Sequence, residues 1–219
     1  MFAMDQNKTQ EERILTPEDA GGGVIVSPDT RRANRVPPGQ SRTRKWPILD
    51  TSGAPPIALD SWKFSIGGLV AQPQEWNWQQ FQALDRVTVF ADFHCVTHWS
   101  RLGNTWEGVS TRKLLALAGG ALPEAAYVLA RGYDPGFSTN LALADFLAED
   151  ALVAFLHDGQ PLTEEHGWPA RLIVPQLYAW KSAKWIAGLE VLDRDKAGFW
   201  ERNGYHMHGD PWKEERFGW

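Results

Sequence analysis

The single cysteine of the chain, Cys95, has histidines on both sides, at His94 and His98. The β-branched and aromatic residues 87–90 predict a buried strand that runs into this cysteine. Strand ends and the loops after them often carry functional side chains, so the position favours a site. Two neighbouring imidazoles could lower the pKa of the thiol or bind a metal together with it.

Four interpretations of Cys95 follow from these neighbours. An inert buried thiol is the commonest fate of a lone cysteine. A zinc site of His94, Cys95 and His98 has poor geometry, because adjacent side chains of an extended segment point to opposite faces. A cysteine nucleophile with a histidine base lacks a local hydrolase signature here. The fourth is one thiolate ligand to a soft, high-valent metal whose remaining ligands come from a bound cofactor.

The composition excludes several classes of protein. The 219 residues suit one good-sized domain, and 22 Lys+Arg against 27 Asp+Glu give a formal charge of −5, which argues against nucleic acid as a partner. A lone cysteine excludes a disulfide framework and a multi-cysteine zinc site. No apolar run of about 18 residues is present, so no integral membrane segment is expected. The 12 Trp and 10 Phe indicate a buried core, an aromatic-walled cofactor cavity or a sugar-stacking surface.

The chain divides at its first tryptophan, Trp46. Residues 1–45 are poor in apolar side chains and contain Gly21-Gly22-Gly23 and Pro37-Pro38-Gly39, so we expect an extended polar N-terminal arm. Residues 46–219 are expected to form one domain. The pair Arg31-Arg32 is followed by no apolar stretch, so we expect no export signal and a cytoplasmic protein.

The pattern of elements predicts an α+β domain with a mixed β-sheet and short helices, because strands outnumber helices and do not alternate regularly with them. Asp158-Gly159 predicts a hairpin turn, and the tryptophan-rich segment after residue 192 is expected to be pinned to the domain surface. The expected strands are residues 62–66, 87–95, 127–130, 152–156, 171–175 and 185–192, and the expected helices are residues 77–84, a segment capped by Ser110-Thr111 and closed by Gly119-Gly120, and residues 141–147.

Three ordered blocks resemble a known family. Residues 92–100, Asp-Phe-His-Cys-Val-Thr-His-Trp-Ser, continued by Trp-Glu-Gly-Val at 106–109, resemble the molybdopterin-binding signature of sulfite-oxidase-fold proteins. They are most similar to the small bacterial branch related to the catalytic subunit of periplasmic methionine-sulfoxide reductase. The second block comprises residues 166–175 and 178–185, and the third lies within residues 198–212. The resemblance runs from about residue 36 to the end of the chain.

The resemblance implies a sulfite-oxidase-like molybdopterin-binding fold in which Cys95 binds molybdenum beside the dithiolene sulfurs of one molybdopterin. A thiolate and a dithiolene are soft donors that suit both oxidation states of the metal during oxygen-atom transfer. The pterin carries a phosphate, which cationic groups and backbone donors must meet. The positions that match the family's contacts are Arg171 and the run Ser182, Ala183 and Lys184.

Further cofactor contacts are implied at five positions spread along the chain. Asn34 and Arg35 are the best match for an upstream loop that touches the cofactor. His166 takes a place near the pterin, His98 is expected to line the cofactor or substrate pocket, and Arg131 follows a strand where relatives touch the cofactor. The abundant tryptophans are expected to pack the core and wall the pterin cavity.

The resemblance also implies an oxygen-atom transferase, which we expect to reduce S- or N-oxides. Sulfite oxidases hold their anionic substrate with an arginine cluster, and the double arginine near their cysteine is replaced here by Arg101-Leu102. Arg101 is still expected to face the metal, and sulfite oxidation is the alternative. A metal-free, tryptophan-rich binding module is the alternative from a different class. No Cys-x-x-Cys-His haem motif is present, so a separate electron-transfer protein is expected.

Overall fold

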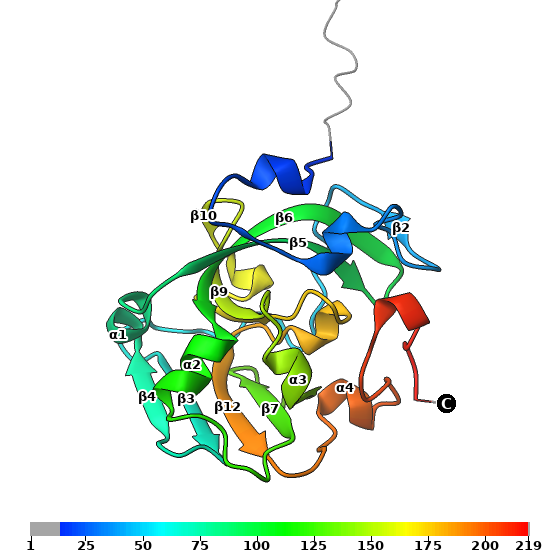
Figure 1. Ribbon diagram of the computed structural model, residues 1–219. Coiled ribbons are helices and arrows are strands. Elements are labelled where there is room, and N and C mark those ends of the chain that lie inside the picture. Colours follow the sequence, from blue (N-terminus) through cyan, green and yellow to red (C-terminus); the bar gives the residue numbers. More distant parts are fainter. Residues whose placement is uncertain (1–13, 219) are drawn as a thin grey trace, which may run out of the picture.

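Two mixed β-sheets organise residues 14–218, the part of the chain that the computed structural model describes (Figure 1). The first sheet has the order β1-β5-β6-β9-β10, with β11 paired to β9 and β2 paired to β6. Its strands are β1 (Ile25–Val26), β2 (Ser41–Arg42), β5 (Val87–Cys95), β6 (Trp99–Ser110), β9 (Leu152–His157), β10 (Gln160–Pro161) and β11 (Arg171–Ile173).

The second sheet has the order β4-β3-β12-β7-β8 and is mixed because β12 runs parallel to β3 and antiparallel to β7. Its strands are β3 (Lys63–Gly68), β4 (Gln74–Asn77), β7 (Tyr127–Gly132), β8 (Ser138–Ala142) and β12 (Ile186–Leu192). The predicted α+β class with mixed sheet pairing is therefore confirmed, with two sheets in place of one.

Alternating burial explains how the two sheets share a core. In β3 the side chains of Phe64 and Ile66 are buried while Lys63 is exposed, as expected of a strand with one face toward the core. They join an apolar cluster that also contains Val153 of β9 and Leu189 of β12, and thus draws on both sheets. Burial of each large apolar side chain contributes about 1.5–3 kcal/mol.

The helices are short, and α1, α2 and α3 each follow directly on a strand. They are α1 (Trp78–Gln82), α2 (Thr111–Leu117), α3 (Leu143–Phe146) and α4 (Phe199–Arg202), and the 3-10 turns are η1 (Pro17–Ala20), η2 (Pro28–Arg31), η3 (Glu164–His166), η4 (Ala179–Lys181) and η5 (Pro211–Lys213). The capping prediction at Ser110 is correct in position, but its side chain makes no capping hydrogen bond. The helix expected at 141–147 is shorter, because residues 138–142 form β8.

The sequence patterns missed β6, the twelve-residue strand that returns from Cys95. It contains Gly103 and Gly108, and glycine is depleted in strands. A Cβ at Gly108 would lie 2.1 Å from the carbonyl oxygen of Val153, so the close approach of β9 requires glycine there. Gly108, which weakens the strand pattern in the sequence, is therefore required by the close approach of β9 to β6.

Residues 14–45, the described part of the expected arm, lie along the first sheet. Strand β1 runs parallel to β5, and β2 runs parallel to β6. Arg35 pairs with the buried carboxylate of Asp92 at 2.6 Å. Residues 1–13 of the expected arm lie outside the described residues, and the domain boundary at residue 45 stays a prediction.

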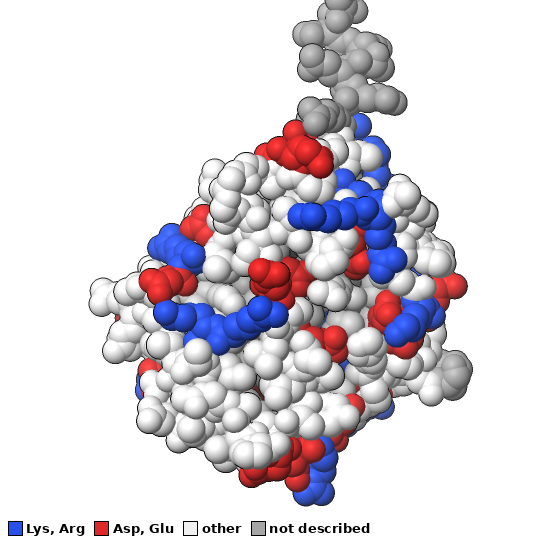
Figure 2. All heavy atoms as spheres, viewed as in Figure 1, with Lys and Arg blue, Asp and Glu red and all other residues white. Residues whose placement is uncertain are grey.

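The C-terminal segment after β12 packs against residues 32–39 and against the end of β5 (Figure 1). Trp212 lies under the Arg32 guanidinium, 4.1 Å from the ring centroid, and its ring meets the His94 ring edge-on at 6.1 Å. The prediction that tryptophans pin this segment to the domain is confirmed. Within residues 14–218 no helix has the length and apolar character needed to cross a membrane. Figure 2 shows basic and acidic side chains interspersed over one face.

Candidate active site

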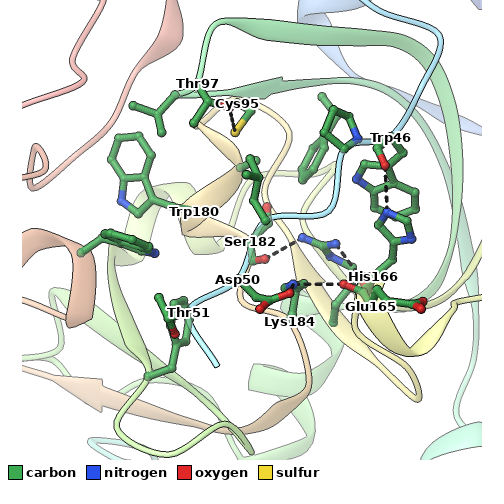
Figure 3. A pocket seen from close by; sticks show the side chains of 18 of the residues that line it. Trp46, Asp50, Thr51, Cys95, Thr97, Glu165, His166, Trp180, Ser182 and Lys184 are labelled. Atoms are coloured by element: carbon green, nitrogen blue, oxygen red, sulfur yellow. Dashed lines mark hydrogen bonds and ion pairs between the residues drawn. The ribbon is translucent and has the colours of Figure 1, made fainter. Parts of the chain in front are cut away.

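A pocket opens beside Cys95, where β5 ends and the chain turns back into β6 (Figure 3). Cys95 itself is only 5% exposed. The lining comes from the segment before β3, the first sheet, the β7–β8 loop, η3, η4, the segment before β12, α4 and the residues after it, and so from residues far apart in sequence. The lining includes Trp46, Asp50, Cys95, Thr97, Asp134, Phe137, Glu165, His166, Arg171, Trp180, Ser182, Lys184, Trp200 and Tyr205.

The Thr97 hydroxyl donates a hydrogen bond to the Cys95 thiol, with Oγ1 3.2 Å from Sγ. Burial raises the pKa of the thiol above its usual range, although Thr97 and the Arg216 guanidinium oppose this shift. The metal-free protein therefore holds Cys95 as a neutral thiol at neutral pH. A metal ion that binds here must displace the proton, as thiolate-binding metals do.

Arg171 places a buried positive charge in the same pocket. Its Nη1 donates to the carbonyl oxygen of His166 and its Nη2 to that of Ser182, both at 2.9 Å. Its Nε is buried without a hydrogen-bond partner, and within residues 14–218 the guanidinium lies near the rings of Trp46, Phe93 and Trp106 and not beside a carboxylate. Burial lowers the pKa of the guanidinium. A buried cation without a counter-ion is a site for an anion.

Lys184 adds a second positive charge to this end of the pocket. Its Nζ donates to the carbonyl oxygen of Glu165 at 3.0 Å and lies 3.5 Å from Oδ2 of Asp50 (Figure 3). Burial and the nearby Arg171 charge lower the pKa of Lys184 to about 8. A bound phosphate would relieve the repulsion between the two cations and keep both charged.

His166 and Trp46 form a flat aromatic wall beside these cations. Their rings stack at 3.8 Å between centroids with 23° between planes, and the His166 Nε2 lies 3.2 Å from the carbonyl oxygen of Trp46. Burial lowers the pKa of His166, so the ring is neutral at neutral pH. A neutral, flat wall next to an anion site suits a heteroaromatic ring that carries a phosphate.

Five of the residues expected at the site thus line one pocket: Cys95, His166, Arg171, Ser182 and Lys184. Ala183 lies beside them in sequence, but its side chain is buried in the shared core. The structure therefore brings together the residues of the first two family-like blocks, although they are up to 89 positions apart.

Arg101 and Arg131 do not line this pocket. Arg101 donates to Asp158 at 2.7 Å and contacts His157 and Asn104, so its guanidinium is already engaged on the first sheet. Arg131 pairs with Glu190 at 2.8 Å on the second sheet. The Arg101 backbone pairs with Phe93 across β5 and β6, but neither arginine is part of the pocket lining, and their roles at the site stay predictions.

Three further expected residues also lie outside the pocket lining. The Asn34 side chain accepts a hydrogen bond from the backbone N–H of Val36. Arg35 is held by Asp92, and the Nδ1 of His98 lies 2.7 Å from the carbonyl oxygen of Gly39. Their roles toward a cofactor stay predictions.

The zinc interpretation finds no ligand set in the structure. The His94 ring is buried, with Nδ1 2.8 Å from the Ser100 hydroxyl, while His98 is turned toward Gly39. Among residues 14–218 no group of three or more His, Cys, Asp or Glu side chains is arranged to hold a metal ion. Any metal at Cys95 therefore needs ligands other than the described side chains, and a bound cofactor can supply them.

An aromatic group around Cys95 was not singled out by the sequence analysis. The Trp180 and Tyr205 rings meet edge-on at 5.1 Å, and Tyr205 stacks on Trp200 at 4.8 Å with 19° between planes. All three line the pocket. The expectation that tryptophans wall the cavity is confirmed in outline, and only the second and third family-like blocks, which contain Trp180 and Trp200, could have indicated which ones.

Residues 52–200 match a family model described as the oxidoreductase molybdopterin binding domain. The chain belongs to this family of molybdopterin-binding oxidoreductases. It is 45% identical, over 189 residues, to the uncharacterized oxidoreductase YuiH of Bacillus subtilis (strain 168), covering 86% of this chain and 94% of that relative. Membership in an oxidoreductase family argues against the metal-free binding module and the hydrolase.

Two further similarities support the assignment. The chain is 31% identical over 149 residues to the putative protein-methionine-sulfoxide reductase subunit YedZ1 of Azospira oryzae, covering 68% of this chain and 56% of that one. It resembles the crystal structure of the sulfane dehydrogenase SoxCD from Paracoccus pantotrophus with a TM-score of 0.60 and 26% identity, over 65% of this chain and 41% of that one. The chain thus spans about half the length of these two relatives. The expected sulfite-oxidase-like fold is confirmed.

The residues of the pocket fit the molybdenum cofactor that the family implies. Cys95 supplies a soft sulfur donor, the kind of ligand that molybdenum shares with dithiolene sulfurs. Arg171 has a buried Nε without a partner, and Lys184 stands beside it. The Trp46–His166 wall lies next to both. The Cys95 thiolate would bind the metal, and the Trp46–His166 wall would pack against the pterin. Arg171 and Lys184 would bind its phosphate.

Proposed function

We propose that the chain catalyses oxygen-atom transfer and reduces uncharged S- or N-oxides at a molybdenum that Cys95 binds. The observation that supports this proposal is the distribution of charge in the pocket. Its cations, Arg171 and Lys184, lie together beside Ser182, where the cofactor's phosphate would be bound. Around Cys95 the lining includes Val96, Thr97 and the aromatic rings of Phe93, Trp99, Trp180 and Tyr205, while the Arg216 guanidinium, which donates to the carbonyl oxygen of Val96, is not part of the lining.

This distribution favours an uncharged substrate over sulfite. A sulfite anion would need its own cation next to the metal, because an anion leaves water only for strong donors. Arg101, the arginine expected for that role, is bonded to Asp158. Aromatic faces instead suit the apolar substituents of a sulfoxide and the partly positive sulfur or nitrogen of an oxide.

The bound molybdenum–molybdopterin group supplies the two-electron redox change that oxygen-atom transfer requires. Reduction of R₂SO to R₂S and water consumes two electrons and two protons. Tyr205 lines the pocket, and burial raises the pKa of its phenol, so the hydroxyl stays protonated at neutral pH and can donate a hydrogen bond to the oxygen of a bound oxide. Trp180 and Trp200 line the same pocket and add apolar surface beside Tyr205.

We propose that the two electrons come from a separate electron-transfer protein, because the 219 residues contain no Cys-x-x-Cys-His motif and only one cysteine. A cytoplasmic location also stays a prediction, which cell fractionation of the producing organism tests.

The first experiment measures metal by mass spectrometry and pterin fluorescence after oxidative release, on protein from a molybdenum-supplied bacterial host. We expect about one molybdenum and one pterin per chain. Arg171→Met should lose most of the pterin, whereas Arg131→Met, the matched control on a strand outside the pocket, should retain it. Zinc, or no metal and no pterin, would contradict the proposed cofactor.

The second experiment tests the direction of catalysis. Enzyme reduced with dithionite is mixed with methyl phenyl sulfoxide or trimethylamine N-oxide, and oxidised enzyme is mixed with sulfite. We expect the oxides to reoxidise the reduced enzyme and sulfite to leave the oxidised enzyme unchanged. Turnover driven by sulfite, with no reoxidation by either oxide, would show that the chain is a sulfite oxidase.

A further inference from the structure

The turn that carries Cys95, residues 95–98, is held from both ends of the chain. On the N-terminal side, the Gln40 side chain donates to the carbonyl oxygen of Cys95 at 3.0 Å, and the backbone N–H of Ser41 donates to that of His98 at 2.8 Å. On the C-terminal side, Arg216 Nη1 donates to the carbonyl oxygen of Val96 at 2.7 Å. No periodic pattern near Cys95 indicates these partners.

Arg216 joins the two sides of this arrangement. Its Nη2 lies 3.3 Å from the carbonyl oxygen of Pro38 and 3.4 Å from that of Gly39. One planar guanidinium therefore bridges the N-terminal segment and the cysteine turn, which a single ammonium group could not do with the same geometry. The guanidinium also lies 5.0 Å from the ring centroid of Tyr178.

The charge of Arg216 is only weakly compensated within the described residues. Its side chain is 8% exposed, and its ion-pair partner Glu214 lies 3.9 Å away with a half-exposed side chain. A positive charge in a buried setting acts strongly on nearby groups, because little water screens it. The Arg216 guanidinium donates to the carbonyl oxygen of Val96, the residue after Cys95, so its positive charge lies close to the cysteine.

We propose that Arg216 is a positioning residue for the molybdenum site: it holds the cysteine turn in place and raises the reduction potential of the metal bound by Cys95. The proposal rests on the assignment of Cys95 as the metal ligand. A nearby cation favours the reduced, more electron-rich form of a metal centre, so its removal should lower the potential. Arg216 touches neither substrate nor cofactor in this proposal.

The first test needs no cofactor and follows hydrogen exchange of the cysteine turn in the metal-free protein. The N–H of His98, which donates to the carbonyl oxygen of Cys95, reports on the turn. In Arg216→Met we expect this amide to exchange at least about tenfold faster than in the wild type. Lys213→Met is the matched control: it removes one positive charge from an exposed side chain of the same C-terminal segment and should leave exchange unchanged.

Arg216→Lys separates geometry from charge. It keeps the positive charge but loses the planar fork, so faster exchange of the turn is expected without a change in net charge. If Arg216→Met does not fold, this variant decides the positioning role. Wild-type protection of the turn in Arg216→Lys would overturn that role, and so would a loss of protection that is uniform over β5, β6 and β9.

The second test measures the reduction potential and the Mo(V) electron paramagnetic resonance spectrum of the loaded protein. We expect a lower potential and a changed spectrum in Arg216→Met, a smaller shift of potential in Arg216→Lys, and wild-type values in Lys213→Met. A fully loaded Arg216→Met protein with the wild-type potential and spectrum would overturn the proposal. Neither test uses a substrate, so an error in the proposed oxide reduction leaves both results interpretable.

Discussion

Lys181 and Glu201 form an ion pair whose side chains are both fully buried, with Nζ 2.7 Å from Oε1. The same Oε1 accepts a hydrogen bond from the indole N–H of Trp180 at 2.9 Å. The pair therefore ties η4 to α4, and each of these elements carries one tryptophan of the pocket, Trp180 and Trp200. The aromatic wall beside Cys95 is thus supported by a charged pair that the pocket itself does not expose.

Lys181→Met should destabilise the protein strongly, because it leaves Glu201 buried without its counter-ion. Loss of one partner of a buried pair costs about 3–5 kcal/mol. We expect the free energy of unfolding, measured in urea, to fall by about 3 kcal/mol. Lys63→Met is the control, since its pair with Glu75 is largely exposed and should matter little. Equal unfolding midpoints for the two variants would show that the buried pair does not stabilise the fold.

Cys95→Ala should abolish oxide reduction and remove molybdenum, while the pterin phosphate can still reach Arg171 and Lys184. Because the side chain is small, we expect a stability loss of no more than about 1–2 kcal/mol. Thr97→Val is the control: it removes the hydroxyl that donates to Sγ and keeps the sulfur ligand. Molybdenum content measured in both variants tests this prediction. A full complement of molybdenum in Cys95→Ala would show that Cys95 is not the metal ligand.

Cofactor retention should fall as the pH rises through about 8. Burial, together with the Arg171 charge, lowers the pKa of Lys184 to about 8, so its ammonium is charged below that pH and neutral above it. Loss of one charge-assisted hydrogen bond to the phosphate weakens binding by about tenfold or more. Pterin fluorescence after gel filtration at several pH values measures this loss.

The matched variant for this pH dependence is Lys184→Arg, which stays charged at every pH tested and should remove the fall near pH 8. In the cofactor-free wild type, the stability of the fold should change with pH in the opposite direction to cofactor retention. The unfolded chain holds the lysine proton up to its ordinary pKa of 10.5, so stability should rise with pH between about 8 and 10.5. Retention that falls equally in the wild type and in Lys184→Arg would assign the effect to another group.

His208 should stabilise the C-terminal segment only while it is protonated. A hydrogen bond to Asp145, opposed by burial and reinforced by Glu215, raises the pKa of His208 to about 9. Its contribution is complete below the ordinary pKa of 6.5 and is lost as the pH rises through 9. Because the side chain is 38% exposed, solvent screening reduces the expected loss in His208→Gln to about 1 kcal/mol below pH 6.5.

Urea unfolding of the wild type and His208→Gln at two pH values tests this sign. The two proteins should differ below pH 6.5 and should become equally stable above pH 9. A difference of the same size under both conditions would mean that His208 acts through packing and not through its charge.

The sequence by itself limited the chemistry possible at Cys95 and predicted six of the twelve strands, β3, β5, β7, β9, β11 and β12. A lone cysteine cannot build a multi-thiolate site, and continuous apolar runs such as residues 152–156 predict strands because their composition favours β structure whatever lies beside them. The blocks around Cys95, Arg171 and Lys184 also indicated one pocket, because three ordered blocks are more specific than one motif. These are local properties of the chain, and local patterns can be recognised without coordinates.

Only the tertiary structure decided which polar groups meet around the cysteine. Arg101 lies six residues after Cys95, yet its guanidinium binds Asp158, whereas Arg216 lies more than a hundred residues away and donates to the residue next to Cys95. Strand β6 was likewise hidden, since Gly108 weakens the pattern and is needed only because β9 passes close by. Such contacts depend on sheet pairing between distant segments, and sequence spacing carries no record of that pairing.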